Sequence, residues 1–187
     1  MDRLDLTLTN TTVLAIDLQD RFVSAIPSVT EDQPVGKALG TLLAGAALLD
    51  LPVVVSEQYP KGLGVTLPYL RAAVPKAEFY AKTHFSCLDD PALRNRLVDG
   101  NPRTHVVIAG VEAHVCVLGT VADLISAGKW VVVAEDAVDS RNPHHRDLAL
   151  AAMRDLGALV VPVETILFRC QRQAGIGAFK ALSALVK

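Results

Sequence analysis

The chain has 187 residues, 51% of them hydrophobic and only 5% aromatic, and its 18 basic and 20 acidic residues give a net charge of −2. This length predicts a single domain over residues 1–187 that can bury a substantial core. Without a long basic block or a basic patch interleaved with aromatics, nucleic acid is not an expected partner. The apolar runs are too short to span a bilayer and the first ten residues lack an apolar signal core, so no membrane association is expected.

Apolar runs alternate with helical patterns along the chain. Most of the runs are continuous stretches of Val, Ile, Leu and Ala, which is typical of strands buried on both faces of a parallel sheet. Asp89-Asp90-Pro91 is a helix start signal, and Gly128 and Gly157 stand where helices should end. In chain order we predict strand Val13–Leu18, helix Val35–Leu49, strand Leu51–Ser56, a loop with a short helical turn over Glu57–Ala73, a weaker strand Ala77–Ala81, helix Pro91–Val98, strand His105–Ala109, helix Ala113–Ala127, strand Trp130–Ala134, helix His144–Leu156, strand Leu159–Val163 and a helical pair within Thr165–Lys187.

This alternation predicts an α/β fold. Right-handed crossovers between parallel strands place helices on both faces, which gives a three-layer, doubly wound sheet of six mostly parallel strands. In the strand order 3-2-1-4-5-6, the switch point lies between the first and fourth strands, and ligands bind beyond the carboxyl ends of the strands there. Asp17, in LAIDLQDRF, and Cys116, in IAGVEAHVC, are both expected at that point.

The three cysteines, Cys87, Cys116 and Cys170, have the spacing of neither a disulfide framework nor a zinc knuckle. Free thiols suit a reducing compartment, so we expect a cytoplasmic protein. Cys87 and Cys170 are interpreted as structural. Cys116 stands just past a glycine turn at the start of a predicted helix, and its role depends on its neighbours.

Asp17, Lys82 and Cys116 each have an ordinary structural interpretation when taken alone. Asp17 can be a structural aspartate bonded to backbone amides, Lys82 in FYAKTHF a solvated strand end, and Cys116 a packed core residue. Together they suit nucleophilic chemistry at strand ends that meet. A helix N-terminus and a lysine favour the thiolate, and a carboxylate can accept the thiol proton and return it to a leaving group. The three suit attack on an amide-like carbonyl.

The chain resembles the isochorismatase-like cysteine hydrolases in VLAIDLQDRF, SEQYPKGLG, FYAKTHFSC, VVIAGVEAHVCV and VVVAEDAVDSR. It is most similar to small hydrolases of unassigned substrate that carry the EQYPKGLG loop, relatives of nicotinamidases and N-carbamoylsarcosine amidases. The resemblance implies that Cys116 is the nucleophile, that Asp17 is the general base and then acid, and that Lys82 keeps the pair ionised. It also implies a cis peptide bond at Val111–Glu112, which turns the backbone N–H groups of Glu112 and Cys116 toward a developing oxyanion.

Two departures from relatives bear on the substrate and on metal binding. The branch that hydrolyses isochorismate lacks the cysteine, so the presence of Cys116 argues against vinyl-ether hydrolysis. The nicotinamidase branch has a metal-binding Asp-x-His after the second strand, where this chain has Gln58-Tyr59-Pro60. Gln and Pro are poor ligands, so we expect neither a metal nor another cofactor and disfavour nicotinamide as the substrate.

Phe22, Tyr59 and His84 are weaker candidates for lining a substrate pocket. Phe22 matches a family position that lines the pocket, but it can equally be an ordinary core aromatic. Tyr59 and His84 can border the cleft or be passive. The pair His144-His145 is interpreted as a solvated helix start, because adjacent helical positions face apart and make poor shared ligands.

The leading hypothesis is a metal-independent cysteine hydrolase that cleaves a small amide, or a related C–N bond next to a carbonyl, through a thioester. The alternative is a thiol-based redox or binding protein on the same fold, although no second cysteine has a CxxC-like spacing from Cys116. A purely structural oligomerisation module explains the apolar helices but not the three site residues. The resemblance also implies a homo-oligomer, a dimer or larger, with FKALSALVK at the C-terminus as a candidate interface.

Overall fold

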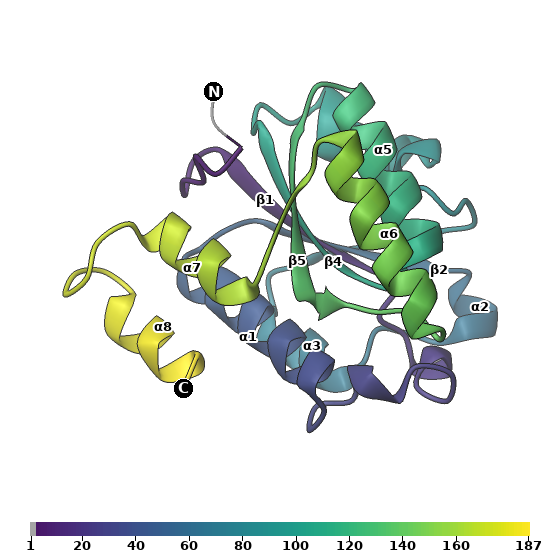
Figure 1. Ribbon diagram of the computed structural model, residues 1–187, viewed down its shortest axis with the longest axis horizontal. Helices are drawn as coiled ribbons and strands as arrows, with labels where there is room; N and C mark the ends of the chain where they lie inside the picture. The colour runs from purple at the N-terminus through teal and green to yellow at the C-terminus, as the bar shows by residue number, and fades with distance from the viewer. Residues whose placement is uncertain (1–2) are drawn as a thin grey trace.

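The computed structural model describes residues 3–187, which form a six-stranded sheet with helices on both faces (Figure 1). The strands lie in the order β3-β2-β1-β4-β5-β6, and all neighbouring pairs are parallel. The predicted doubly wound α/β fold and its strand order are therefore confirmed. The strands are β1 (Thr11–Ile16), β2 (Val53–Gln58), β3 (Glu78–Lys82), β4 (His105–Gly110), β5 (Trp130–Val138) and β6 (Leu159–Val161).

The core consists of two hydrophobic layers, one on each face of the sheet. Successive strand residues point to opposite faces, so Val13 and Ala15 of β1 belong to one layer and Leu14 and Ile16 to the other. Burial on both faces explains why the central strands are continuous apolar runs. On the first face lie α1 (Pro34–Leu48), α3 (Pro68–Ala73), α7 (Val163–Gln171) and α8 (Phe179–Leu185), and on the second lie α4 (Pro91–Arg94), α5 (Leu118–Ser126) and α6 (Pro143–Leu156), while α2 (Pro60–Leu63) is a single turn after β2.

Several element boundaries differ from the sequence predictions. β1 ends at Ile16 rather than Leu18, because Asp17 has a φ of 55° and leaves the extended conformation. β2 continues through Gln58 into the predicted loop, since it stays paired with β3 as far as Lys82. The predicted helix Ala113–Ala127 begins as a π-helical turn, in which the N–H of Val117 reaches back five residues to Glu112 O. Within residues 3–187, no helix is long and apolar enough to cross a membrane.

The ends of β1 and β4 touch at Gly110. This residue has a φ of 131°, and a Cβ placed on it would lie 2.2 Å from Ile16 O and 2.7 Å from Ile16 N. A side chain is therefore excluded both by the backbone conformation and by the neighbouring strand. The approach brings the segment after β4, which carries Cys116, beside Asp17 at the end of β1.

Gly110→Ala is expected to lower the free energy of unfolding by about 3 kcal/mol or more, because the added methyl group meets backbone atoms of β1. Gly128→Ala is the matched control: its φ of 81° is also positive, but nothing lies within 4 Å of the added Cβ. That variant is expected to lose only about 1 kcal/mol. Urea unfolding of both proteins measures the difference, and equal losses would contradict the close-approach explanation.

Candidate active site

A buried ion pair joins the carboxyl ends of β1 and β3. Lys82 Nζ lies 2.7 Å from Asp17 Oδ2, and both side chains are 0% exposed. Ser56 Oγ, from β2, donates to the other carboxylate oxygen of Asp17 at 2.7 Å. The Asp17 carboxylate is thus bonded to two side chains, whereas the structural interpretation expected bonds to backbone amides. The cost of desolvating two charges largely offsets their attraction, so such a pair contributes little to stability.

Lys82 is surrounded by oxygen acceptors. Besides Asp17, Nζ donates to Gln58 Oε1 at 2.7 Å and to the carbonyl oxygens of His84 and Phe85 at 3.2 Å. The three N–H groups of an ammonium therefore face four oxygens, three of which are uncharged. The interpretation of Lys82 as a solvated strand end is wrong, because the turn after β3 folds its carbonyl groups over Nζ.

Cys116 lies in the π-helical turn Ala113–Val117 and is 5% exposed. Its thiol lies near Asp17 and Lys82, so that the charges of both act on it. Burial and the negative charge of Asp17 raise the pKa of the thiol to about 12, and the opposing effect of Lys82 is smaller. Lys82 favours the thiolate, as expected, but burial and the charge of Asp17 outweigh it in the resting site. Cys116 keeps its proton beside a carboxylate that can accept it.

The segment before Cys116 is tied to the loop after β5. The peptide bond Val111–Glu112 is cis, at the position implied by the sequence resemblance. Ala113 N donates to Asp139 O at 2.8 Å, and the buried Glu112 carboxylate accepts from Arg141 N at 3.0 Å. The loop after β5 thus holds the segment that leads into the turn with the thiol.

The three predicted pocket-lining residues have different environments. Phe22 is partly buried and packs against the hydrophobic layer under α1. Tyr59 is 54% exposed, and with Lys82 it lines a shallow hollow of about 320 Å³ beside β3. His84 has an exposed side chain and contributes its backbone carbonyl to the site.

Sequence reasoning missed three buried polar side chains, Ser56, Gln58 and Gln19. Ser56 and Gln58 contact Asp17 and Lys82 directly. Gln19 clamps the backbone of Gln58: its Oε1 accepts from Gln58 N at 2.7 Å and its Nε2 donates to Gln58 O at 3.0 Å. The polar residues Ser56-Glu57-Gln58 directly after an apolar run could have indicated Ser56 and Gln58. We assigned them only to a strand end and a loop.

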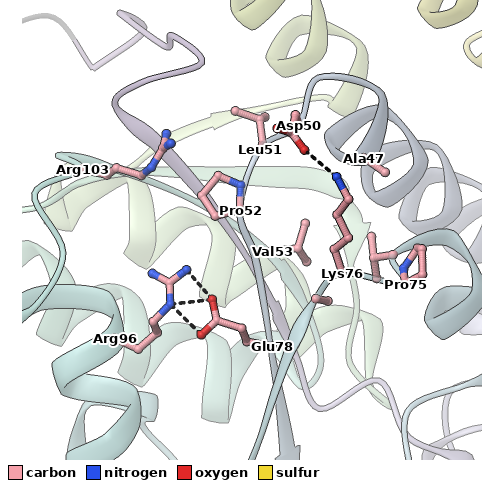
Figure 2. Close-up of a pocket in the computed structure, with 12 residues that line it drawn as sticks. Ala47, Asp50, Leu51, Pro52, Val53, Pro75, Lys76, Glu78, Arg96 and Arg103 are labelled. Carbon is pink, nitrogen blue, oxygen red and sulfur yellow. Dashed lines mark hydrogen bonds and ion pairs between the residues drawn. The ribbon is translucent and has the colours of Figure 1, made fainter.

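A larger hollow, of about 540 Å³, lies at the opposite end of the same strands (Figure 2). Pro52 and Val53 line it at the amino end of β2, and the ion pairs Lys76–Asp50 and Arg96–Glu78 border it. Asp17, Lys82 and Cys116 do not line it. The size of a cavity therefore does not identify the chemical site in this protein.

The site residues provide few free ligands for a metal ion. Across residues 3–187, no three His, Cys, Asp or Glu side chains are grouped so that they could hold one. Both ends of the Gln58 amide are engaged, since its Nε2 donates to Thr83 O at 2.8 Å and its Oε1 accepts from Lys82. His144 and His145 are exposed at the start of α6, and the His145 ring lies 4.8 Å from that of His114.

Comparison with known proteins identifies relatives across most of the chain. Residues 11–165 match the family model described as the isochorismatase domain. Isochorismatase domain-containing protein 2A of Mus musculus is 35% identical over 171 residues, which are 91% of this chain and 80% of that protein. The secreted isochorismatase effector Isc1 of Phytophthora sojae is 36% identical over 150 residues, 79% of this chain and 71% of the effector.

Solved structures share the fold. The MAR1 ribonuclease from Caenorhabditis elegans has a TM-score of 0.88 and 32% identity, and the match covers 97% of this chain and 91% of that one. YcaC from Escherichia coli, described as an octameric hydrolase of unknown specificity, has a TM-score of 0.83 at 24% identity, over 90% of this chain and 82% of that one. At this lower identity the YcaC match shows the fold alone.

Asp17→Asn is expected to lower the pKa of the Cys116 thiol by roughly 1–3 units, because the neighbouring carboxylate charge is removed while the Lys82 ammonium remains. Iodoacetamide labelling of Cys116 should therefore begin at lower pH in the variant than in the wild type. Peptide mapping of the labelled protein gives the rate at each cysteine as a function of pH.

Cys170 provides an internal control for this measurement, because its thiol is buried to nearly the same extent as that of Cys116 but is not affected by Asp17, so its labelling profile should not change in the variant. Faster labelling of Cys170 in the variant than in the wild type would report unfolding. A folded variant whose Cys116 labelling begins at the same pH as in the wild type, or at higher pH, would contradict control of the thiol by Asp17.

Proposed function

The chain belongs to the isochorismatase family, and we propose that it is a metal-independent cysteine hydrolase that cleaves a small amide or related C–N bond through a thioester. Family membership supports hydrolase activity. The observation that carries the cysteine mechanism is the proximity of the Cys116 thiol to a carboxylate held by Ser56 and Lys82. The proposed nucleophile, its proton acceptor and a fixed cation thus lie together at one edge of the sheet.

In the first half of the reaction, Asp17 accepts the thiol proton as Cys116 Sγ attacks the substrate carbonyl carbon. The carbonyl π electrons move to the oxygen, and the backbone N–H groups of Glu112 and Cys116 stabilise this oxyanion. Collapse of the tetrahedral intermediate breaks the C–N bond, and Asp17 returns the proton to the departing amine. The acyl group is left as a thioester on Cys116.

In the second half, Asp17 removes a proton from water, whose oxygen attacks the thioester carbonyl. The C–S bond breaks, the acid product leaves, and Cys116 regains its proton from Asp17. Lys82 remains an ammonium throughout and balances one negative charge, whether Asp17 or the sulfur carries it. Because burial and the charge of Asp17 keep the resting thiol protonated, proton transfer to Asp17 accompanies its attack.

Burial of the thiol supports a small substrate, because Cys116 is 5% exposed at the base of the strand ends. A ribonuclease function, as named for the Caenorhabditis elegans relative, is less well supported: the net charge of −2 offers no excess of cations for a polyanion. Engagement of both ends of the Gln58 amide supports hydrolysis without a metal.

We also propose that the protein self-associates. YcaC, which shares this fold, is described as an octamer. The C-terminal segment considered as an interface is partly used within the chain, because Leu182 of α8 is buried in the layer that includes α1.

Free cysteines support a reducing, cytoplasmic location, although one relative is a secreted effector.

Ammonia release from a panel of small aliphatic and aromatic amides tests the proposed function. One or more amides should be hydrolysed in the presence of a chelator, and intact mass after acid quenching should show the acyl group on Cys116. Cys116→Ala is expected to lose about 10³-fold or more in kcat/KM, whereas Cys170→Ala, which removes another buried free thiol, should retain activity. Activity that survives Cys116→Ala, or cleavage of RNA in place of amides, would overturn the proposal.

Asp17 and Lys82 should act as one unit in this reaction. Asp17→Asn removes the base, with an expected loss of about 10²–10⁴-fold in the acylation rate. Lys82→Met keeps the stem and deletes the charge, so thiolate formation moves to higher pH and some activity should return in alkaline buffer. The double variant should be little worse than Asp17→Asn alone. Losses that multiply, measured with the best amide, would mean that the two residues act independently.

A further inference from the structure

The side chain of Gln58 has a single hydrogen-bonding orientation. Its Oε1 accepts from Lys82 Nζ at 2.7 Å and its Nε2 donates to Thr83 O at 2.8 Å. An ammonium can only donate and a carbonyl oxygen can only accept, so rotating the amide by half a turn would place like groups against each other at both ends. The carboxamide therefore connects the cation to the backbone of the turn that follows it.

The backbone of Gln58 is held as firmly as its side chain. Gln58 pairs with Lys82 across β2 and β3, and Tyr59 N donates to Lys82 O at 2.8 Å. The side chain of Gln19 closes hydrogen bonds to both the N–H and the C=O of Gln58. Ser56, two residues earlier on the same face of β2, bonds Asp17. One face of this strand thus positions both members of the ion pair.

The neutrality of Gln58 determines which anion Lys82 contacts. Within residues 3–187, Asp17 provides the carboxylate at ion-pair distance from Lys82, and the other three acceptors are uncharged. Glu57, the neighbour of Gln58 in β2, points to the opposite face and pairs with Arg71 at 2.9 Å. A second carboxylate in the place of Gln58 would compete with Asp17 for the ammonium.

We propose that Gln58 is a positioning residue whose neutral amide holds the Lys82 ammonium against Asp17 and so controls how readily Cys116 loses its proton. The inference deepens the proposed function and rests on it. The charged and titratable groups that face the thiol are Asp17, Lys82 and the neighbouring thiol of Cys87, and only the first two contact the Gln58 network. Gln58 acts through Lys82 and need not touch substrate.

Gln58→Glu tests the inference because it is isosteric and replaces the amide by an acid. As a carboxylate, residue 58 would draw Lys82 away from Asp17 and add a negative charge, so labelling of Cys116 by iodoacetamide should shift to higher pH by roughly one unit. Once protonated, the acid can again donate to Thr83 O and accept from Lys82, so the wild-type hydrolysis rate should return in acidic buffer. Gln173→Glu, the same change at an exposed position near the C-terminus, is the matched control and should shift neither profile.

Gln58→Met provides a variant without added charge, in case Gln58→Glu does not fold. It removes the acceptor and the donor, and kcat should fall by about 10²-fold with little change in KM. Cys170 should keep its wild-type labelling profile if the variants fold. A folded Gln58→Glu whose labelling profile matches those of the wild type and Gln173→Glu, or a Gln58→Met with wild-type kcat, would overturn the inference.

The labelling experiment needs no substrate, which separates this inference from the proposed function. If no amide is hydrolysed but the labelling profile of Gln58→Glu shifts, the hydrolase proposal fails and control of the thiol through Lys82 stands. If amides are hydrolysed and the profile does not shift, only the role of Gln58 fails.

Discussion

The ion pair between Lys82 and Asp17 is the constraint on which the site is built. Two charges with fully buried side chains are tolerated only when further polar groups replace the water that they have lost. Ser56, Gln58 and two backbone carbonyl groups do so, and they come from β2 and from the turn after β3. The pair therefore requires that three strand ends lie together, which the order β3-β2-β1 in the sheet achieves.

The fourth strand brings in Cys116, the proposed nucleophile, through a backbone contact rather than a side-chain contact. Gly110 lets the end of β4 approach Ile16 so closely that the following turn places Cys116 beside Asp17. The result is a site that is neutral at rest: one carboxylate, one ammonium and one protonated thiol. In the proposed mechanism, proton transfer from sulfur to carboxylate moves the negative charge between two positions near the same cation, and no charge has to enter or leave the buried site.

Strand β2 performs two tasks because its residues alternate between faces. Ser56 and Gln58 point toward the ion pair. Glu57 points away and accepts from Thr66 N, Thr66 Oγ1 and Arg71 Nη2 at 2.7–2.9 Å, which anchors the loop between α2 and α3. Glu57, the charged residue of this strand, thus has its own partners, and the two networks stay separate. A one-residue slip of the strand would exchange the faces and break both.

The amino-acid sequence by itself determined the architecture. Continuous apolar runs alternating with helical patterns predict a doubly wound parallel sheet, and its switch point places Asp17 and Cys116 at one edge. These features follow from local composition and periodicity, which can be determined from the sequence without knowledge of tertiary contacts. Strand ends were less accurate, because they depend on pairing and on single dihedral angles such as the positive φ of Asp17.

Only the tertiary structure decided the protonation of the thiol and the partners of the cation. Burial of Cys116 next to Asp17 reverses the expected preference for the thiolate, and burial is not a property of residues 110–120 alone. Gln58 and Ser56 contact residues 24 and 39 positions away in the chain. Pattern and spacing identify which groups reach an edge of a sheet, whereas charge state depends on distances and desolvation that exist only once the chain has folded.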